Sequence, residues 1–112
     1  MSNRLLQVED LLKREISNLI IHQVKDPRFA NFNIVDVKAS QDLSKAVVFF
    51  TIIGSNEDSA PQKDHIEKFA SMIRSKVSKL LHLKRVPKLI FKFDNSLDRA
   101  NSINNLINSI NE

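Results

Sequence analysis

The side chains that could act in catalysis or hold a metal ion are few in this sequence, and they are scattered. The histidines are His22, His65 and His82, and none is spaced with another histidine or a carboxylate as in an HExxH zinc motif. The chain has no cysteine, which excludes a thiolate zinc site, a cysteine nucleophile and a disulfide framework. Each histidine is better explained as a surface or helix-end residue, and we expect neither a metal nor a cofactor.

The glycine and aspartate positions argue against the common catalytic and nucleotide-binding loops. Gly54 is the single glycine, so there is no GxSxG elbow, no P-loop, no dinucleotide fingerprint and no GxxG loop of the typical KH domain. Asp26, Asp42 and Asp94 each stand beside a predicted turn or strand end, where an Asx turn or a cap explains them. We therefore expect a protein without enzymatic activity.

Charge is distributed unevenly along the chain, whose formal net charge is +4. Residues 1–62 hold 7 Lys or Arg against 8 Asp or Glu, whereas residues 68–93 hold no acidic residue. The basic residues of that segment are Lys68, Arg74, Lys76, Lys79, Lys84, Arg85, Lys88 and Lys92. A positive field of this kind attracts phosphates, although a solvated lysine-rich helix is the plainer explanation. Because the sequence predicts no exposed aromatic pairs for base stacking, RNA would be bound through its backbone and shape.

The elements that must position these charges follow from hydrophobic periodicity. Apolar residues at three- and four-residue steps predict a helix from Ser2 or Asn3 that ends by Asp26, before Pro27. Segments 32–40 and 45–53 predict two strands, the second apolar on both faces, and their four-residue link predicts an antiparallel hairpin. A second helix is predicted over 63–82 and a third strand from Pro87 to Phe93.

The second helix carries an apolar stripe, which comprises Ile66, Phe69, Ala70, Ile73, Val77, Leu80 and Leu81. At about 100° per residue, Lys68, Lys76 and Lys79 fall on one flank of a straight helix, with Arg74 on the opposite side. Lys84, Arg85 and Lys88 then crowd the turn into the third strand. The basic flank therefore continues into that turn.

The chain of 112 residues predicts a single domain over 1–112, in which 97–112 form a short helix. The element order helix-strand-strand-helix-strand indicates an α+β fold with helices on one face of a three-stranded sheet. Charged residues interrupt the N-terminal apolar stretch, and no segment approaches the roughly 20 apolar residues of a membrane span. We expect a cytoplasmic monomer that neither enters a membrane nor binds a small-molecule substrate.

Several short motifs, in order, make the chain resemble the bacterial ribosome-binding factor A family. In its first half these are Lys25-Asp26-Pro27-Arg28, Ser40-Gln41-Asp42-Leu43 and the Ala46 that opens a strand. In its second half they are Ile73-Arg74-Ser75, Leu83-Lys84-Arg85, Val86-Pro87, Phe91 and Asp94-x-Ser96. The resemblance covers nearly the whole chain.

This resemblance implies a KH-like fold of the second topology, without a GxxG loop. It also implies a non-catalytic factor that binds the immature small ribosomal subunit and its rRNA, assists late rRNA processing and subunit maturation, and matters for growth in the cold. Two positions depart from the family pattern. Ser71, after Ala70, replaces the glycine at a helix kink, and Ala100 stands where a glycine usually follows the terminal motif.

The residues expected to neutralise rRNA phosphates are Lys76, Lys79, Lys84, Arg85 and Lys88, with Arg28 and Lys45 extending the surface. A protein–protein module is an alternative, in which the apolar strand from Val47 to Ile53 pairs with a partner and the basic surface serves solubility. A small hydrolase is a third alternative, which the lack of glycine loops and acid–base clusters disfavours. Binding that is insensitive to salt would indicate the second alternative, and turnover would indicate the third.

Overall fold

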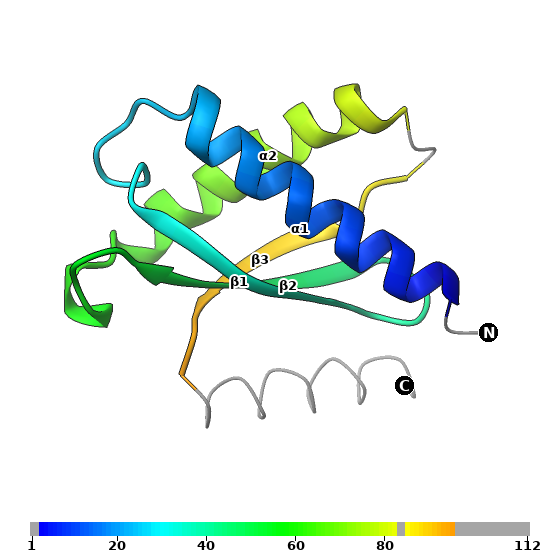
Figure 1. The fold of residues 1–112 in the computed structure, drawn as a ribbon, viewed down its shortest axis with the longest axis horizontal. Coiled ribbons are helices and arrows are strands. Elements are labelled where there is room, and N and C mark those ends of the chain that lie inside the picture. The colour runs from blue at the N-terminus through cyan, green and yellow to red at the C-terminus, as the bar shows by residue number, and fades with distance from the viewer. Residues whose placement is uncertain (1–2, 83–84, 96–112) are drawn as a thin grey trace.

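The structure, a computed structural model, describes residues 3–82 and 85–95. Its elements are α1 (Asn3–Gln23), β1 (Phe32–Ala39), β2 (Lys45–Ile52), a short 3-10 helix η1 (Glu57–Ser59), α2 (Lys63–Leu81) and β3 (Lys88–Phe93). This order confirms the predicted α+β arrangement (Figure 1). The helix predicted over 97–112 lies outside the described residues.

The three strands form one mixed sheet in the order β1-β2-β3. β1 and β2 are antiparallel, with Phe32 opposite Ile52 and Ala39 opposite Ala46, as the four-residue link predicts. β3 runs parallel to β2. Because β2 is paired along both edges, it has no free edge for a partner strand, and the suggested strand pairing by segment 47–53 is wrong in this fold.

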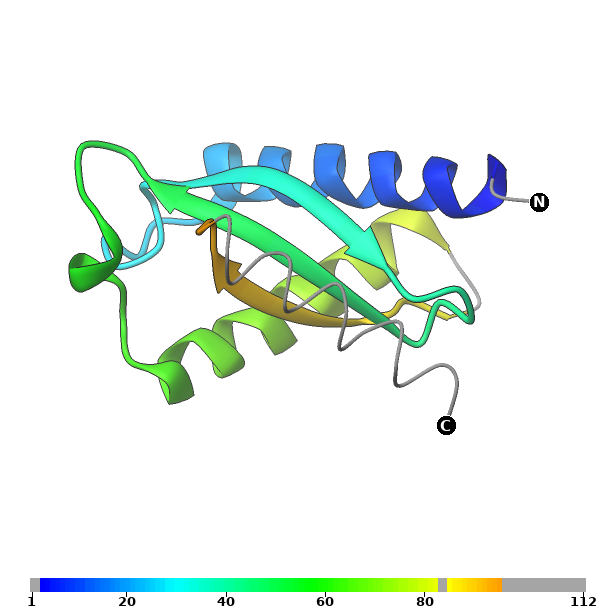
Figure 2. The ribbon, with the colours of Figure 1, turned by 90° about the horizontal axis from the view of Figure 1, so that it is seen from below.

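Both helices pack on one face of the sheet, as predicted, and the main core lies between them and the sheet (Figure 2). From β2, Ala46, Val48 and Phe50 enter this core. The alternate residues Val47 and Phe49 form a second, small buried cluster. Since side chains alternate between the faces of a strand, the apolar pattern on both sides of β2 is confirmed.

An aromatic cluster joins α2 to the sheet and to the loop after α1. The Phe69 ring of α2 stacks on Phe29 with centroids 4.1 Å apart and planes 1° from parallel. It also meets Phe91 of β3 edge-on at 5.5 Å. In the same way Phe32 stacks on Phe50 at 4.1 Å. These contacts fix the loop after α1 against α2, where the basic residues gather.

Glu9 makes a contact that the periodicity did not indicate. Its side chain is buried, and its Oε2 accepts a hydrogen bond of 2.7 Å from the backbone N–H of Ala39. This hydrogen bond links α1 to the end of β1. It also satisfies a buried N–H, which would cost about 1–3 kcal/mol if left without a partner. Glu9 is therefore a structural residue, whereas its acidic neighbour Asp10 is exposed.

The face that α2 buries agrees with the predicted stripe over its middle turns, where Phe69, Ala70, Ile73 and Val77 are buried. Leu80 departs from the prediction because half of it is exposed, whereas Leu81, also in the predicted stripe, packs against the core. The helix ends at Leu81, and the cap residue His82 after it adopts a left-handed conformation with φ 51°. It runs as one α-helix through Ala70 and Ser71, so a bend at these two residues stays a prediction.

Candidate nucleic-acid interface

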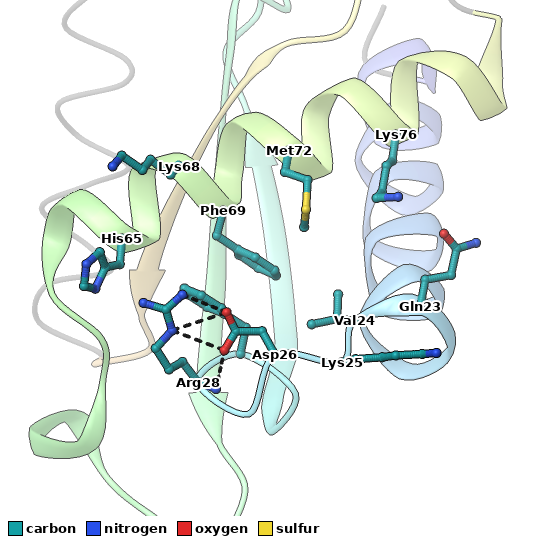
Figure 3. A pocket seen from close by; sticks show the side chains of 11 residues that line it. Gln23, Val24, Lys25, Asp26, Arg28, His65, Lys68, Phe69, Met72 and Lys76 are labelled. Atoms are coloured by element: carbon teal, nitrogen blue, oxygen red, sulfur yellow. Dashed lines mark hydrogen bonds and ion pairs between the residues drawn. The ribbon is translucent and has the colours of Figure 1, made fainter.

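Three surface hollows among the described residues border α2, and each is lined by at least one residue of the predicted basic set. We name each hollow after one basic residue. The Lys76 hollow lies between α2 and the segment that leaves α1, and its volume is about 410 Å³. Its lining, shown in Figure 3, comprises Gln23, Val24, Lys25, Asp26, Arg28, Phe29, His65, Lys68, Phe69, Met72 and Lys76. Of the predicted set, this hollow therefore brings together Arg28 and Lys76.

The Asp-Pro-Arg segment folds back on itself at this hollow. The Arg28 guanidinium donates two hydrogen bonds to Asp26, from Nη2 to Oδ2 at 2.7 Å and from Nε to Oδ1 at 3.2 Å. Its backbone N–H also donates to Asp26 Oδ1 at 2.9 Å. These hydrogen bonds from Arg28, side chain first and then backbone, lower the pKa of Asp26. Arg28, which the sequence predicts to extend the basic surface, is thus ion-paired with Asp26, and its guanidinium carbon lies 5.3 Å from the centroid of the Phe29 ring.

The Lys79 hollow opens beside the last turns of α2. It is lined by Ser71, Arg74, Ser75, Ser78, Lys79, Arg85 and Val86. Lys79 and Arg85 thus line the same hollow, while Lys84 lies outside the described residues. Arg74 was expected on the opposite side of the helix from Lys79, yet it lines the same hollow. Arg74 reaches across to donate to the Val86 carbonyl from Nε at 3.1 Å and Nη2 at 2.8 Å.

The Lys88 hollow follows the groove between α2 and β3. It is lined by Lys63, Ile66, Glu67, Ala70, Ser71, Arg74 and the strand residues 88–92. Lys45 stands opposite Lys88 in the parallel register, and the Lys88 N–H donates to the Ser44 carbonyl at 3.0 Å. Two members of the predicted binding set, Lys45 and Lys88, are therefore adjacent across β2 and β3. Lys45 lines none of the three hollows that border α2.

The turn that sets this register is held by Asp42. Its Oδ1 accepts hydrogen bonds from Ser40 Oγ at 2.8 Å, from the Ser44 N–H at 3.1 Å and from Ser44 Oγ at 2.8 Å. Leu43, with φ 59°, takes the left-handed position of the turn. The hydrogen bond from Ser40, followed by those from Ser44, lowers the pKa of Asp42 to about 2. The Ser-x-Asp-Leu motif is thus a turn lock beside Lys45.

We predict a pH dependence from this lock. Because the folded pKa of Asp42 is depressed, its carboxylate stabilises the fold above the ordinary carboxyl pKa, and this contribution is lost as pH falls toward about 2. The stability difference between the wild type and Asp42→Ala should therefore shrink between pH 6 and pH 2. Carbon-detected NMR titration of the Asp42 carboxyl should give a midpoint near 2, and a midpoint in the usual range near 3.9 would contradict the lock.

The cations around α2 have no described carboxylate as an ion-pair partner, apart from Arg28. Within the described ranges, ion pairs join Arg14 to Glu15, Arg28 to Asp26 and Lys38 to Asp36. The surface around α2 can therefore hold anions by charge.

No group of three metal-binding side chains occurs in the part of the chain that the structure describes, and no described helix could cross a membrane.

Sequence reasoning missed two members of the Lys76 hollow. The sequence places Lys25 only within a motif and gives Met72 no predicted role, yet both line the hollow. Lys68 was placed on the basic flank but not among the binding residues. A signal for Met72 was present, because an apolar residue stood on the basic flank between Lys68 and Lys76. Lys25 could be placed only once the loop after α1 was known to fold against α2.

The sequence comparisons all match this chain to proteins of the same description. A family model described as ribosome-binding factor A matches residues 4–107. The protein named Ribosome-binding factor A in Desulforamulus reducens is 34% identical over 111 residues, which cover 99% of this chain and 92% of that protein. The protein of the same name in Staphylococcus saprophyticus is 32% identical over 112 residues, which cover 100% of this chain and 98% of that protein.

Solved structures are similar in fold. The crystal structure of ribosome-binding factor A from Thermus thermophilus superposes with a TM-score of 0.67 at 21% identity, covering 80% of this chain and 93% of that one. A Thermus thermophilus homology model, fitted into the cryo-EM map of a complex of that factor with 30S, gives 0.60 at 20% identity, covering 82% and 92%. At this identity the likeness establishes the fold, which is KH-like.

Proposed function

This chain belongs to the ribosome-binding factor A family, and from that premise we propose that it binds the small ribosomal subunit through phosphates of its rRNA, without a catalytic step. The relative from Thermus thermophilus that was fitted into a 30S complex supports the choice of subunit. The family name supports binding as the activity.

One observation carries the rRNA part of the proposal. The cations of α2 and the segment after it face hollows that contain few acidic groups, and their side chains pair with no described carboxylate. A lysine or arginine left in this state can bind a phosphate and release its condensed counterions. Lys76, Lys79, Arg85 and Lys88 fit this role, with Lys45 beside Lys88. Arg28 would contribute only by exchanging Asp26 for a phosphate.

The finer features of the proposal follow from the family resemblance. The preferred target is the immature subunit, bound during late rRNA processing and maturation and of most importance for growth in the cold. The protein acts in the cytoplasm as a monomer. It uses no metal or cofactor, since binding by charge and shape requires neither.

Sedimentation of a cell lysate through a sucrose gradient tests the function. We expect the protein to travel with free small subunits and to leave them as the salt concentration rises, because phosphate contacts release counterions. Depletion of the protein in the cold should raise the level of unprocessed small-subunit rRNA. A protein absent from every ribosomal fraction at low salt, or bound equally to mature ribosomes, would count against the proposal.

A further inference from the structure

The Lys76 hollow differs in chemistry from the rest of the basic surface, because it has an apolar floor. Phe29 and Phe69 are buried at its base with only 3% and 5% of their surface exposed. Val24 lies at the side, and Met72 projects into the hollow with 41% of its surface exposed (Figure 3). A phosphate gains nothing from such a floor, so the hollow fits a ligand that is partly apolar.

The rim of the hollow is cationic. Lys25, Lys68 and Lys76 line it, and none of them is paired with a described carboxylate. The one acidic residue of the lining is Asp26, whose charge the guanidinium of Arg28 compensates at 2.7 Å. The ligand should therefore carry negative charge next to its apolar part. A volume of about 410 Å³ lies within the usual range for a small-molecule site.

We propose that the Lys76 hollow receives one unpaired nucleotide of RNA, with its base against Met72 and the apolar floor and its flanking phosphates on Lys25, Lys68 and Lys76. This inference deepens the proposed function and rests on it. A thioether makes favourable contacts with aromatic rings, and a base is such a ring. In a duplex the bases are stacked inside and cannot reach this floor, so the hollow selects single-stranded RNA.

Methionine NMR offers a direct reporter of the hollow. The chain has two methionines, Met1 and Met72, so labelling with methyl-¹³C methionine gives at most one other methyl signal. Met72→Leu assigns the Met72 signal by removing it. A single-stranded RNA hexamer should shift this signal upfield through the ring current of the base. The same sequence paired with its complement, at equal phosphate concentration, should leave it in place.

Variants separate the base from the phosphates. Met72→Ala should weaken binding of the hexamer about fivefold, within the range for loss of a thioether–ring contact, and should leave the salt dependence unchanged. Lys68→Gln with Lys76→Gln should reduce the slope of log affinity against log salt by about 1.4, at roughly 0.7 per phosphate of a single strand. Leu80→Ala is the matched control, because Leu80 is another half-exposed apolar residue of α2 but does not line the hollow.

The outcomes distinguish this inference from the function on which it rests. If the Met72 signal does not respond to the hexamer while the protein still sediments with small subunits, the nucleotide site is wrong and the function stands. A shift caused by an acidic peptide but not by RNA would assign the hollow to a protein tail and overturn the inference. Loss of subunit binding by the wild type would remove the proposed function itself.

Discussion

Replacing Lys79, Arg85 and Lys88 together with glutamine should weaken binding to the small subunit by roughly tenfold or more at low salt. The slope of log affinity against log salt should fall by about two to three units, because each neutralised phosphate contributes roughly 0.7 to 0.9. Titration of labelled protein onto purified small subunits, from low to high salt, measures both quantities. At high salt the variant and the wild type should converge, since screening removes the contribution of the three charges.

A control removes two positive charges from α1 instead, and the two variants are compared per removed charge. Arg4 and Lys13 are exposed residues of α1 and line none of the three hollows. Arg4→Gln with Lys13→Gln should therefore change the salt slope by much less than one unit per charge. An equal fall in slope per removed charge in the two variants would mean that net charge alone drives binding. An unchanged slope in the triple variant would remove Lys79, Arg85 and Lys88 from the contact surface.

The order of elements could be predicted because it depends on local patterns. The period of apolar residues predicted α1 and α2, and the short link between two strands allowed only a hairpin. The run of apolar residues in β2 predicted a strand that is either central or covered on both faces, and β2 is central with buried residues on both faces. Each of these signals lies within one element or between neighbours in the chain, where sequence spacing and spatial spacing agree.

The candidate site was predictable as a segment but not as an arrangement. The angle around a helix places a Cα atom, whereas a long side chain can reach several ångströms from it. Arg74 shows this, because it bends toward the Val86 carbonyl and lines the same hollow as Lys79. Glu9 and Arg28 show a second limit, which is that sequence spacing does not reveal hydrogen-bond partners. Their bonds, to a distant backbone N–H and to a neighbouring carboxylate, form only when the chain folds.

Phe69→Ala should be the most destabilising of these changes, because Phe69 supports both the core and the floor of the Lys76 hollow. Its ring stacks on Phe29 at 4.1 Å and meets Phe91 at 5.5 Å, and only 5% of the residue is exposed. Truncation of a buried phenylalanine to alanine costs about 3–5 kcal/mol through lost burial and the cavity left behind. Chemical denaturation should show this loss in the free energy of unfolding. Thermal denaturation should show a fall in the melting temperature of roughly 10 °C or more.

Phe93→Ala provides the matched control for the same change of side chain. Phe93 is half-buried at the end of β3, and its described ring contact is with Phe50 at 5.7 Å. It should cost clearly less, since a partly exposed ring leaves a smaller cavity. Phe69→Leu, which keeps most of the volume, should recover much of the stability. If Phe93→Ala proved as destabilising as Phe69→Ala, the aromatic stack between α2 and the loop after α1 would not be what holds the hollow in shape.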